Sequence, residues 1–419
     1  MTPATPLTPA TTAATSATPP TPATTAPPPS AAPAQAPRGA LELTLDPVGR
    51  EEFLARHWER APLRLARDEA GRFDGLLAVA DAEELVCSTG IRVPAFRLAR
   101  DGTQVPLSGY TEDVPWSPGR FSGLARVDRV AAEYADGATI ILQALHLHWR
   151  PVAEYCRGLE AALGWPVQAN AYLTPASAQG FAVHHDTHDV LVLQVAGEKR
   201  WRLYPPVLEL PLKSQRWSGE WDAGEPCEEL TLRPGDTLYI PRGWPHEAVA
   251  THADSLHLTV GLHPPTRLDA LRAALEEAAA GDVELRRSLG ADGALPRDVL
   301  DRLDLSPEAV AARARRRFVA GRRPILDDQL ACLRAADGLG VDDPVARRAT
   351  VIADRDGATL RFEGREVAFP ERVREAVEFV HGAPGPFTAA ELPGPLDAPG
   401  RLVLVRRLVR EGYLRPVRA

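Results

Sequence analysis

Two histidines and one aspartate have residue types and a spacing that could hold a metal ion. In the run GFAVHHDTHDVLVLQV, His184 and Asp186 stand two residues apart. On a β-strand their side chains would leave the same face. In GDTLYIPRGWPHEA, Pro241 and Gly243 would turn a predicted strand and deliver His246 as a third ligand. Two histidines and one carboxylate leave open positions on a metal, as in non-haem Fe(II) oxygenases, so the sequence predicts an Fe(II) site.

The segment around His246 follows the second cupin motif, G-x5-P-x-G-x2-H. Gly235, Pro241, Gly243 and His246 occupy its four defined positions, whereas Ala250 stands where an Asn usually follows. An HxD dipeptide alone is a weak signal, because histidines beside acids are common on exposed strands. The HxD dipeptide and the cupin motif together are a much more specific signal of a metal site than the dipeptide alone.

The remaining histidines have different predicted roles. His185 has the opposite strand parity to His184 and should point away from the metal. His188 has the right parity but lies about 6.6 Å further along the strand, too far to share the ion. His257 alternates with polar neighbours in SLHLT and should face the barrel interior, near a cosubstrate or substrate. Structural roles are expected for His146, His148, His252 and His263.

These residues would be positioned by a β-rich core. Short apolar runs separated by polar or Gly/Pro breaks predict strands at TIILQAL, ANAYLT, DVLVLQV, WRLY, EELTL, DTLYI and SLHLTVGL. Residues 151–163 predict a helix between them. The order favours an antiparallel double-sheet barrel, a double-stranded β-helix of the cupin type.

The chain divides into four predicted parts. Residues 1–38, rich in Thr, Pro and Ala, predict a disordered tail. The catalytic domain would span 39–265, beginning with a strand at ELTLD and a helix over 47–58. Helix-start signals at Thr266/Asp269 and Ser306-Pro307 predict a helical segment over 266–345. A hairpin, helices and a closing strand predict a winged helix over 346–419.

Composition excludes several classes of protein. Hydrophobic residues make up 44% of the chain and charged residues 25%, which is typical of a folded protein. A net charge of -8 gives no overall attraction to nucleic acid or anionic lipid. The four cysteines form no CxxC pair, and no apolar run approaches the ~18 residues of a membrane span. We therefore expect a cytoplasmic protein without disulfides or structural zinc.

The stretch NAYLTPASAQGFAVHHDTHDVLVLQVAGEKRWRLYPP, followed by PRGWPHEAVATHADSLHLTV, resembles the ribosomal oxygenase family of JmjC hydroxylases. The resemblance covers roughly residues 40–265, and the parts that follow are similar to that family's dimerisation and winged-helix domains. It implies hydroxylation of a His or Arg side chain of a ribosomal protein, with Fe(II), O2 and 2-oxoglutarate. It also implies that His184, Asp186 and His246 are the iron ligands.

The resemblance further implies residues that bind the cosubstrate. Lys199 falls where the family places a cation for the far carboxylate of 2-oxoglutarate. Only Lys199 and Lys213 among the 48 basic residues are lysines, so a Lys at this place suggests that its geometry is needed. Asn170 and Tyr172, two apart on one predicted strand, resemble residues that line the same pocket.

Three alternatives remain open from the residues alone. The same triad would serve a JmjC lysine demethylase, or a hydroxylase of another peptide or amino acid. A different class is a non-catalytic metal-binding cupin joined to a winged-helix transcription regulator, although such a site would not need the cation of Lys199.

The predicted partners are a protein substrate and a second copy of the chain. A homodimer is expected through 266–345, where Leu268, Leu271, Ala274 and Leu275 give an apolar helical face. Arginines over 401–410 could enter a DNA groove, but Arg is the usual surface cation of this chain, so nucleic-acid binding is not expected.

Overall fold

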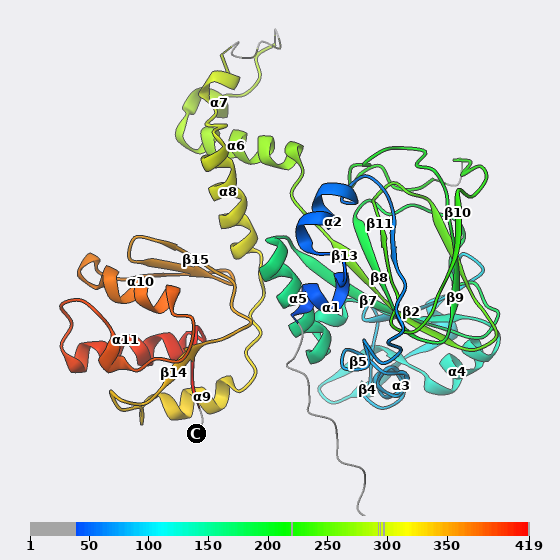
Figure 1. Cartoon of the computed structure of the whole chain (residues 1–419), viewed down its shortest axis with the longest axis horizontal. Helices are drawn as coiled ribbons and strands as arrows, with labels where there is room; N and C mark the ends of the chain where they lie inside the picture. Colours follow the sequence, from blue (N-terminus) through cyan, green and yellow to red (C-terminus); the bar gives the residue numbers. More distant parts are fainter. Residues whose placement is uncertain (1–38, 219–220, 292, 294, 296–297, 418–419) are drawn as a thin grey trace, which may run out of the picture. The chain divides into compact units, whose positions relative to one another are not determined.

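An eight-stranded antiparallel sheet dominates the first two thirds of the chain (Figure 1). The computed structural model describes residues 39–218, 221–291, 293, 295 and 298–417, so the predicted tail over 1–38 lies outside the described residues. The strand order is β1-β11-β8-β13-β7-β6-β2-β3. The strands are β1 Leu63–Leu65, β2 Phe96–Arg100, β3 Thr103–Gln104, β6 Thr139–Leu142, β7 Val167–Thr174, β8 Asp189–Ala196, β11 Thr237–Ile240 and β13 Ser255–Leu262.

A second sheet packs against one face of the first. It contains β10 (Glu228–Leu232), β9 (Lys199–Leu203) and β12 (His246–Ala250), and bridges at Gln179 and His184 extend it beyond β12. Alternate residues of both sheets meet in one apolar cluster of Val190, Val192, Trp201, Leu203, Leu230, Leu232, Leu238 and Ile240. The core is therefore the predicted cupin-type double-sheet barrel.

Helices cover the outer face of the large sheet. Leu191, Leu193 and Val195, which alternate with the inward residues of β8, join a second and larger apolar core with residues of these helices. Because both faces are covered, β8 is an almost continuous apolar run. The helices of this part are α1 Ala40–Leu45, α2 Arg50–Arg56, α3 Val79–Cys87, α4 Val127–Ala135 and α5 Arg150–Leu163.

The predicted helix over 151–163 is confirmed as α5, but the predicted strand at ELTLD is wrong. These residues form helix α1. Leu41 and Leu45 are one helical turn apart, so five residues of alternating polarity also fit one face of a helix. Packing decides between the two: α1 contacts α5, and the Thr44 hydroxyl lies 2.5 Å from the Tyr155 hydroxyl in a buried hydrogen bond.

Two helix-start signals after the barrel are confirmed. The Thr266 Oγ1 accepts a hydrogen bond from the Asp269 N–H, and the Asp269 carboxylate accepts one from the Thr266 N–H. Ser306 Oγ likewise accepts from the Ala309 N–H. The helices of this segment are α6 Arg267–Gly281, α7 Val283–Arg286, α8 Pro307–Ala320 and α9 Gln329–Ala336. None of the described helices is long and apolar enough to cross a membrane.

The C-terminal part has its own apolar core. The predicted hairpin is β16 (Thr359–Phe362) and β17 (Arg365–Ala368), whereas the closing strand β18 (Leu414–Pro416) pairs with β14 (Val345–Arg347). This core also includes Cys332 and Ala336 of α9, a helix that lies within the predicted helical segment over 266–345. The other elements are β15 Ala353–Asp356, α10 Arg374–Gly382 and α11 Ala398–Arg410.

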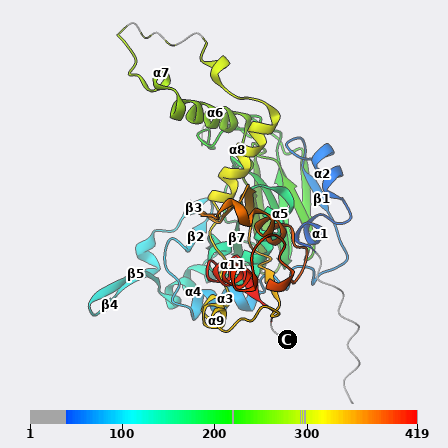
Figure 2. The ribbon, with the colours of Figure 1, turned by 90° about the vertical axis from the view of Figure 1, so that its left-hand side faces the viewer.

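One hairpin extends away from the barrel, β4 (Thr111–Trp116) with β5 (Gly119–Ala125), as Figure 2 shows. The short 3-10 helices are η1 Leu107–Gly109, η2 Leu145–Leu147, η3 Leu300–Arg302, η4 Glu371–Val373 and η5 Ala389–Glu391.

Candidate metal centre

The structure brings the three predicted metal ligands together. One ligand atom from each of His184, Asp186 and His246 lies within 4.8 Å of the others, and His246 Nε2 is 3.9 Å from Asp186 Oδ2. This is the one cluster of at least three potential ligands found among the described residues. A single ion can therefore be held by two imidazoles and one carboxylate, with its remaining positions open.

Backbone hydrogen bonds tie the two halves of the triad to each other. The His246 N–H donates to the His184 carbonyl at 2.8 Å, and the His184 N–H donates to the His246 carbonyl at 3.2 Å. The Gly243 N–H donates to the Asp186 carbonyl at 3.0 Å. The ligands are therefore fixed by the pairing of two chain segments that lie far apart in the sequence.

Two glycines of the cupin motif allow the turns at the two ends of β11. Gly235 has φ +91° and Gly243 has φ +87°, both in the left-handed region. A Cβ at Gly235 would lie 2.2 Å from the Glu69 carbonyl oxygen, and one at Gly243 would lie 2.4 Å from the Leu208 carbonyl oxygen. No other residue fits these positions without a shift of the backbone.

Both histidines are held in the tautomer that a metal requires. His184 Nδ1 lies 2.9 Å from the Ala182 carbonyl oxygen and His246 Nδ1 lies 3.0 Å from the Trp244 carbonyl oxygen. A carbonyl can only accept, so each Nδ1 donates and each Nε2 keeps its lone pair for an ion. Burial also lowers the pKa of His246 to about 4, which keeps that imidazole neutral.

A buried polar network supports the turn before His246. Arg242 forms ion pairs with Glu59 at 2.7 Å and with Asp189 at 3.5 Å. The Tyr239 hydroxyl donates to Asp189 at 2.7 Å and accepts from the Glu59 N–H at 2.9 Å. Burial raises the pKa of Asp189 to about 6, and the Tyr239 and Arg242 contacts oppose that rise. The network anchors the strand end that carries the third ligand.

A cavity of about 250 Å³ opens beside the triad, and Lys199 lies buried in its wall. Lys199 Nζ donates to Thr174 Oγ1 at 2.9 Å, and Thr139 Oγ1 donates to the same oxygen at 3.1 Å. Burial lowers the pKa of Lys199 to about 7, and no acidic side chain among the described residues pairs with it. A carboxylate brought against Nζ would restore its charge.

Aromatic rings form another wall of this cavity. Tyr172 and His257 stack with ring centroids 4.8 Å apart at 3°, and Trp201 meets His257 edge-on at 5.6 Å. Burial, followed by the charge of Lys199, lowers the pKa of His257 well below its usual value. His257 Nδ1 and Trp201 Nε1 are buried without a hydrogen-bond partner among the described residues. Two unsatisfied polar atoms and a buried cation fit an oxygen-rich dianion such as 2-oxoglutarate.

The other predicted residues lie outside this cavity. Asn170 is absent from its lining, and its Oδ1 accepts from the Ala144 N–H at 2.9 Å. His185 points away from the metal ligands, with its Nε2 3.2 Å from the Gln215 carbonyl oxygen and its ring against Trp217 and Trp221. His188 stacks on His263 at 4.6 Å.

Several lining residues carried no recognisable signal in the sequence. Arg97 comes from β2 and lies over the Phe181 ring at 5.0 Å. Thr139 of β6 and Trp201 of β9 also line the cavity. They belong to no motif, and only the sheet order brings them to the site. Lys199 and Trp201 stand two residues apart on β9, so the alternation of side chains along a strand could have placed both on one face of the sheet.

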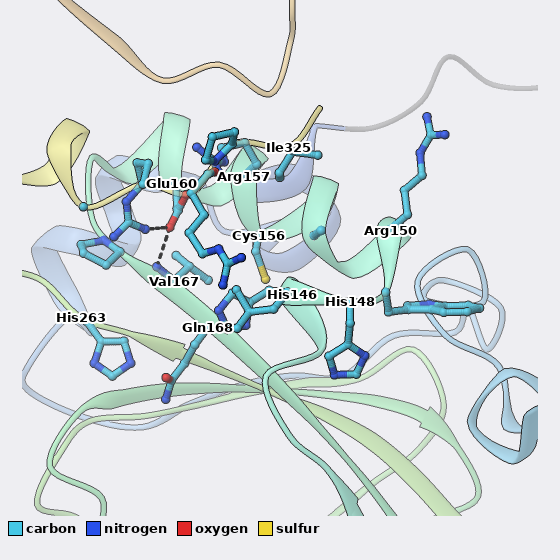
Figure 3. Close-up of a pocket in the computed structure, with 18 of the residues that line it drawn as sticks. His146, His148, Arg150, Cys156, Arg157, Glu160, Val167, Gln168, His263 and Ile325 are labelled. Atoms are coloured by element: carbon cyan, nitrogen blue, oxygen red, sulfur yellow. Dashed lines mark hydrogen bonds and ion pairs between the residues drawn. The ribbon is translucent and has the colours of Figure 1, made fainter. Parts of the chain in front are cut away.

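A larger cavity of about 590 Å³ lies beside α5 (Figure 3), and none of the three metal ligands lines it. Its cations are largely paired: Arg157 Nε lies 3.3 Å from Glu160, and Arg322 forms an ion pair with the same carboxylate. Glu160 also accepts from the Val167 N–H at 3.1 Å. The metal-ligand cluster lies in the smaller cavity, so we place the chemistry there.

A comparison with known protein families agrees with this geometry. Residues 146–270, which include the triad and Lys199, match the JmjC domain family. This segment therefore resembles a JmjC domain, and here it forms most of the cupin-type barrel. The chain is also similar in sequence to ribosomal oxygenases.

Three relatives illustrate this similarity. Ribosomal oxygenase 2 of Bos taurus is 31% identical over 316 residues, which are 72% of this chain and 63% of the relative. Ribosomal oxygenase 1 of Gallus gallus is 34% identical over 255 residues, 59% of this chain and 41% of the relative. The bifunctional lysine-specific demethylase and histidyl-hydroxylase NO66 of Drosophila persimilis is 31% identical over 224 residues, 53% and 31% of the two chains. The chain thus spans less than half the length of the last two proteins.

The fold is similar to that of a solved bacterial structure. The Escherichia coli ribosomal oxygenase YcfD, in complex with cobalt and 2-oxoglutarate, matches with a TM-score of 0.53 and 18% identity. The match covers 88% of this chain and 98% of YcfD. At this identity the likeness establishes the fold.

Proposed function

We propose that this chain is an Fe(II)- and 2-oxoglutarate-dependent oxygenase that hydroxylates a protein side chain. The observation that carries the proposal is one cavity that combines the His184, Asp186 and His246 ligand set with the buried Lys199. A purely structural metal site would have no need of a buried cation beside it, since burial makes that cation unfavourable.

The protein residues would mainly bind and orient the metal ion, the cosubstrate and the substrate. His184, Asp186 and His246 would hold Fe(II), which with 2-oxoglutarate and O2 supplies oxidation of an unactivated C–H bond and releases succinate and CO2. Lys199 would pair with the far carboxylate of the cosubstrate, and Thr174 would orient the lysine. The indole N–H of Trp201, and Nδ1 of His257 when it carries the proton, would donate the remaining hydrogen bonds to the cosubstrate.

The apolar walls would keep water away from the reacting atoms. Val190, Val192 and Trp201 line the cavity and belong to the apolar cluster between the sheets. Exclusion of water strengthens the pairing of Lys199 with a carboxylate and limits side reactions. Tyr172 and His257 would present a flat wall to the substrate or cosubstrate.

The proposed substrate is a histidine or arginine of a ribosomal protein. The relatives are named ribosomal oxygenases, and one name includes histidyl-hydroxylase and lysine demethylase activities. These names support a substrate protein of the ribosome. We also propose a cytoplasmic location. Demethylation remains the alternative with the same triad.

Calorimetry tests the site. Titration of the Mn(II)-loaded protein with 2-oxoglutarate should give one binding event per chain, because Mn(II) suits the same ligands without turnover. A His246→Ala variant should bind neither ion nor cosubstrate tightly. Absence of 2-oxoglutarate binding to the metal-loaded wild-type protein would refute the proposal in favour of a non-catalytic cupin.

Mass spectrometry tests the reaction. Ribosomal proteins from a strain that lacks this chain should miss one added oxygen that the wild-type strain carries. A methyl group that persists on lysine only in the deletion strain would indicate demethylation instead. Identical ribosomal proteins in both strains would contradict a ribosomal substrate.

We further propose that 266–345 forms a homodimer and that the C-terminal part is a winged helix. Leu271 and Leu275 of α6 are 42% and 39% exposed, one turn apart, which supports a partner on this face. The arginines of α11 are engaged within the chain, which supports our expectation that the module does not bind nucleic acid. Their partners are Ala390 and Leu396 for Arg401, Leu339 for Arg406, Glu411 for Arg407 and Asp337 for Arg410.

A further inference from the structure

Arg97 presents an unpaired guanidinium edge at the metal cavity. Its Nε donates to Gln143 Oε1 at 2.7 Å, and its guanidinium lies over the Phe181 ring at 5.0 Å. Among the described residues, no hydrogen bond or ion pair engages its two terminal nitrogens. Arg97 pairs in register with Ile141, which pairs with Tyr172, so Arg97 lies on the barrel-facing side of the sheet. The side chain is therefore held in place with both terminal NH2 groups left over.

The charges at the cavity leave Arg97 without a counterion. Under the proposed function, Asp186 is used by the metal and Lys199 by the cosubstrate. Glu247 also lines the cavity, but its carboxylate forms an ion pair with Arg202 at 3.5 Å. It also accepts from the Tyr204 hydroxyl at 2.8 Å and from Gln179 Nε2 at 2.9 Å. Among the lining residues that the structure describes, no carboxylate remains free for a cationic substrate.

Two aromatic rings of the cavity wall each have one face occupied. One face of Phe181 is covered by Arg97, and one face of Tyr172 is stacked on His257. Phe181 in turn packs near the metal ligand His184, with centroids 5.6 Å apart. A guanidinium or ammonium that approached the covered face of Phe181 would meet the positive charge of Arg97 instead of the π-face.

We propose that Arg97 is a specificity residue that excludes cationic side chains from the metal and admits uncharged ones, such as an imidazole. This inference rests on the proposed function and narrows its substrate class. Like charges brought together in a water-poor cleft repel strongly, which is a way to reject a wrong substrate. An uncharged imidazole or carboxamide can instead accept a hydrogen bond from a terminal nitrogen of Arg97.

The experiment uses the full chain loaded with Fe(II) and 2-oxoglutarate, incubated with ribosomal proteins from a strain that lacks it. Tandem mass spectrometry locates the residues that gain oxygen. The wild-type protein should oxidise an uncharged residue. Arg97→Gln and Arg97→Glu should raise the ratio of oxidised arginine and lysine to oxidised uncharged residues by about tenfold or more, because the repulsion is removed or reversed.

Two controls separate charge from packing. Arg97→Lys keeps the charge and should keep the wild-type ratio. Arg100→Gln, on the same strand β2 but with its side chain paired to Glu133 at 3.3 Å, should also leave the ratio unchanged. Calorimetry on the Mn(II)-loaded Arg97→Gln protein should give the wild-type affinity for 2-oxoglutarate, which a residue that binds the cosubstrate would lower.

The outcomes that overturn the inference are distinct from failure of the proposed function. Two results would refute only the role of Arg97 and leave the proposed function standing. One is oxygen added to arginine or lysine by the wild-type protein. The other is the same ratio of oxidised cationic to oxidised uncharged residues in Arg97→Glu as in the wild type. Loss of 2-oxoglutarate affinity in Arg97→Gln would reassign the residue to the cosubstrate. If no ribosomal protein gains oxygen, the proposed function itself fails and the inference with it.

Discussion

At the scale of single residues, the metal ligands make the sharpest prediction. His184→Ala, Asp186→Ala and His246→Ala should each lower 2-oxoglutarate turnover by more than about 100-fold, because loss of a direct ligand exceeds the 10- to 100-fold effect of the groups behind it. Turnover is measured as succinate released. Circular dichroism should show an intact fold.

The matched control for the ligands is an exposed histidine of the same part of the barrel. His252→Ala should retain turnover, since His252 lies at the surface after β12. His185 is a poor control, because it is buried against Trp217 and Trp221 and its loss would disturb that loop. Full activity in any of the three ligand variants would contradict the assignment.

Lys199 makes a second prediction at this scale. Lys199→Ala should weaken 2-oxoglutarate binding by roughly 10- to 150-fold, the equivalent of about 1.5–3 kcal/mol for a hydrogen bond between charged groups. Metal affinity should change little, since Lys199 is not a ligand. Calorimetry on the Mn(II)-loaded protein measures both. Lys213→Ala, which changes the other lysine at an exposed position, should bind as the wild type does.

The pKa of Lys199 gives this contact a pH dependence. With a pKa of about 7 in the free protein, Lys199 is mostly neutral at pH 8 and mostly charged at pH 6. A bound carboxylate raises that pKa, so binding at pH 8 should take up as much as about one proton, and affinity should fall as pH rises above about 7. Calorimetry in buffers of different ionisation enthalpy measures the uptake. Equal uptake in Lys199→Met would show that another group is responsible.

At the scale of elements, the turn before β12 makes the third prediction. Gly243→Ala should destabilise the protein by about 1–3 kcal/mol or more and weaken metal binding, because φ is +87° and the new Cβ would meet the Leu208 carbonyl oxygen. Thermal unfolding and metal titration check the two effects. Gly281→Ala, with no atom within 4 Å of its Cβ position at the end of α6, is the control and should be neutral.

At the scale of the whole molecule, the helical segment makes the fourth prediction. Light scattering on the chain without residues 1–37 should give the mass of a dimer, and Leu271→Glu with Leu275→Glu should give a monomer, because charges would be buried on an apolar contact. Leu330→Glu, at a leucine 72% exposed on α9, should leave the mass unchanged. A monomer mass for the starting protein at micromolar concentration would rule out the dimer.

The sequence by itself predicted those features that depend on local chemistry. His184 and Asp186 share a strand parity, and the cupin turn is encoded by glycines that the backbone requires at Gly235 and Gly243. The Thr266 and Ser306 helix starts were recognisable because a cap involves residues three apart. Five alternating residues were too few to separate strand from helix at α1.

Only the tertiary structure decided which side chains share the cavity. Arg97, Thr139 and Lys199 come from three strands and meet because the sheets pair β2 with β6 and fold β9 opposite. Asn170 has the parity of Tyr172, yet its oxygen accepts a backbone N–H outside the lining. Sequence spacing cannot predict such contacts, because they depend on strand order and register. The burial that lowers the pKa of Lys199 likewise exists only once the barrel has closed.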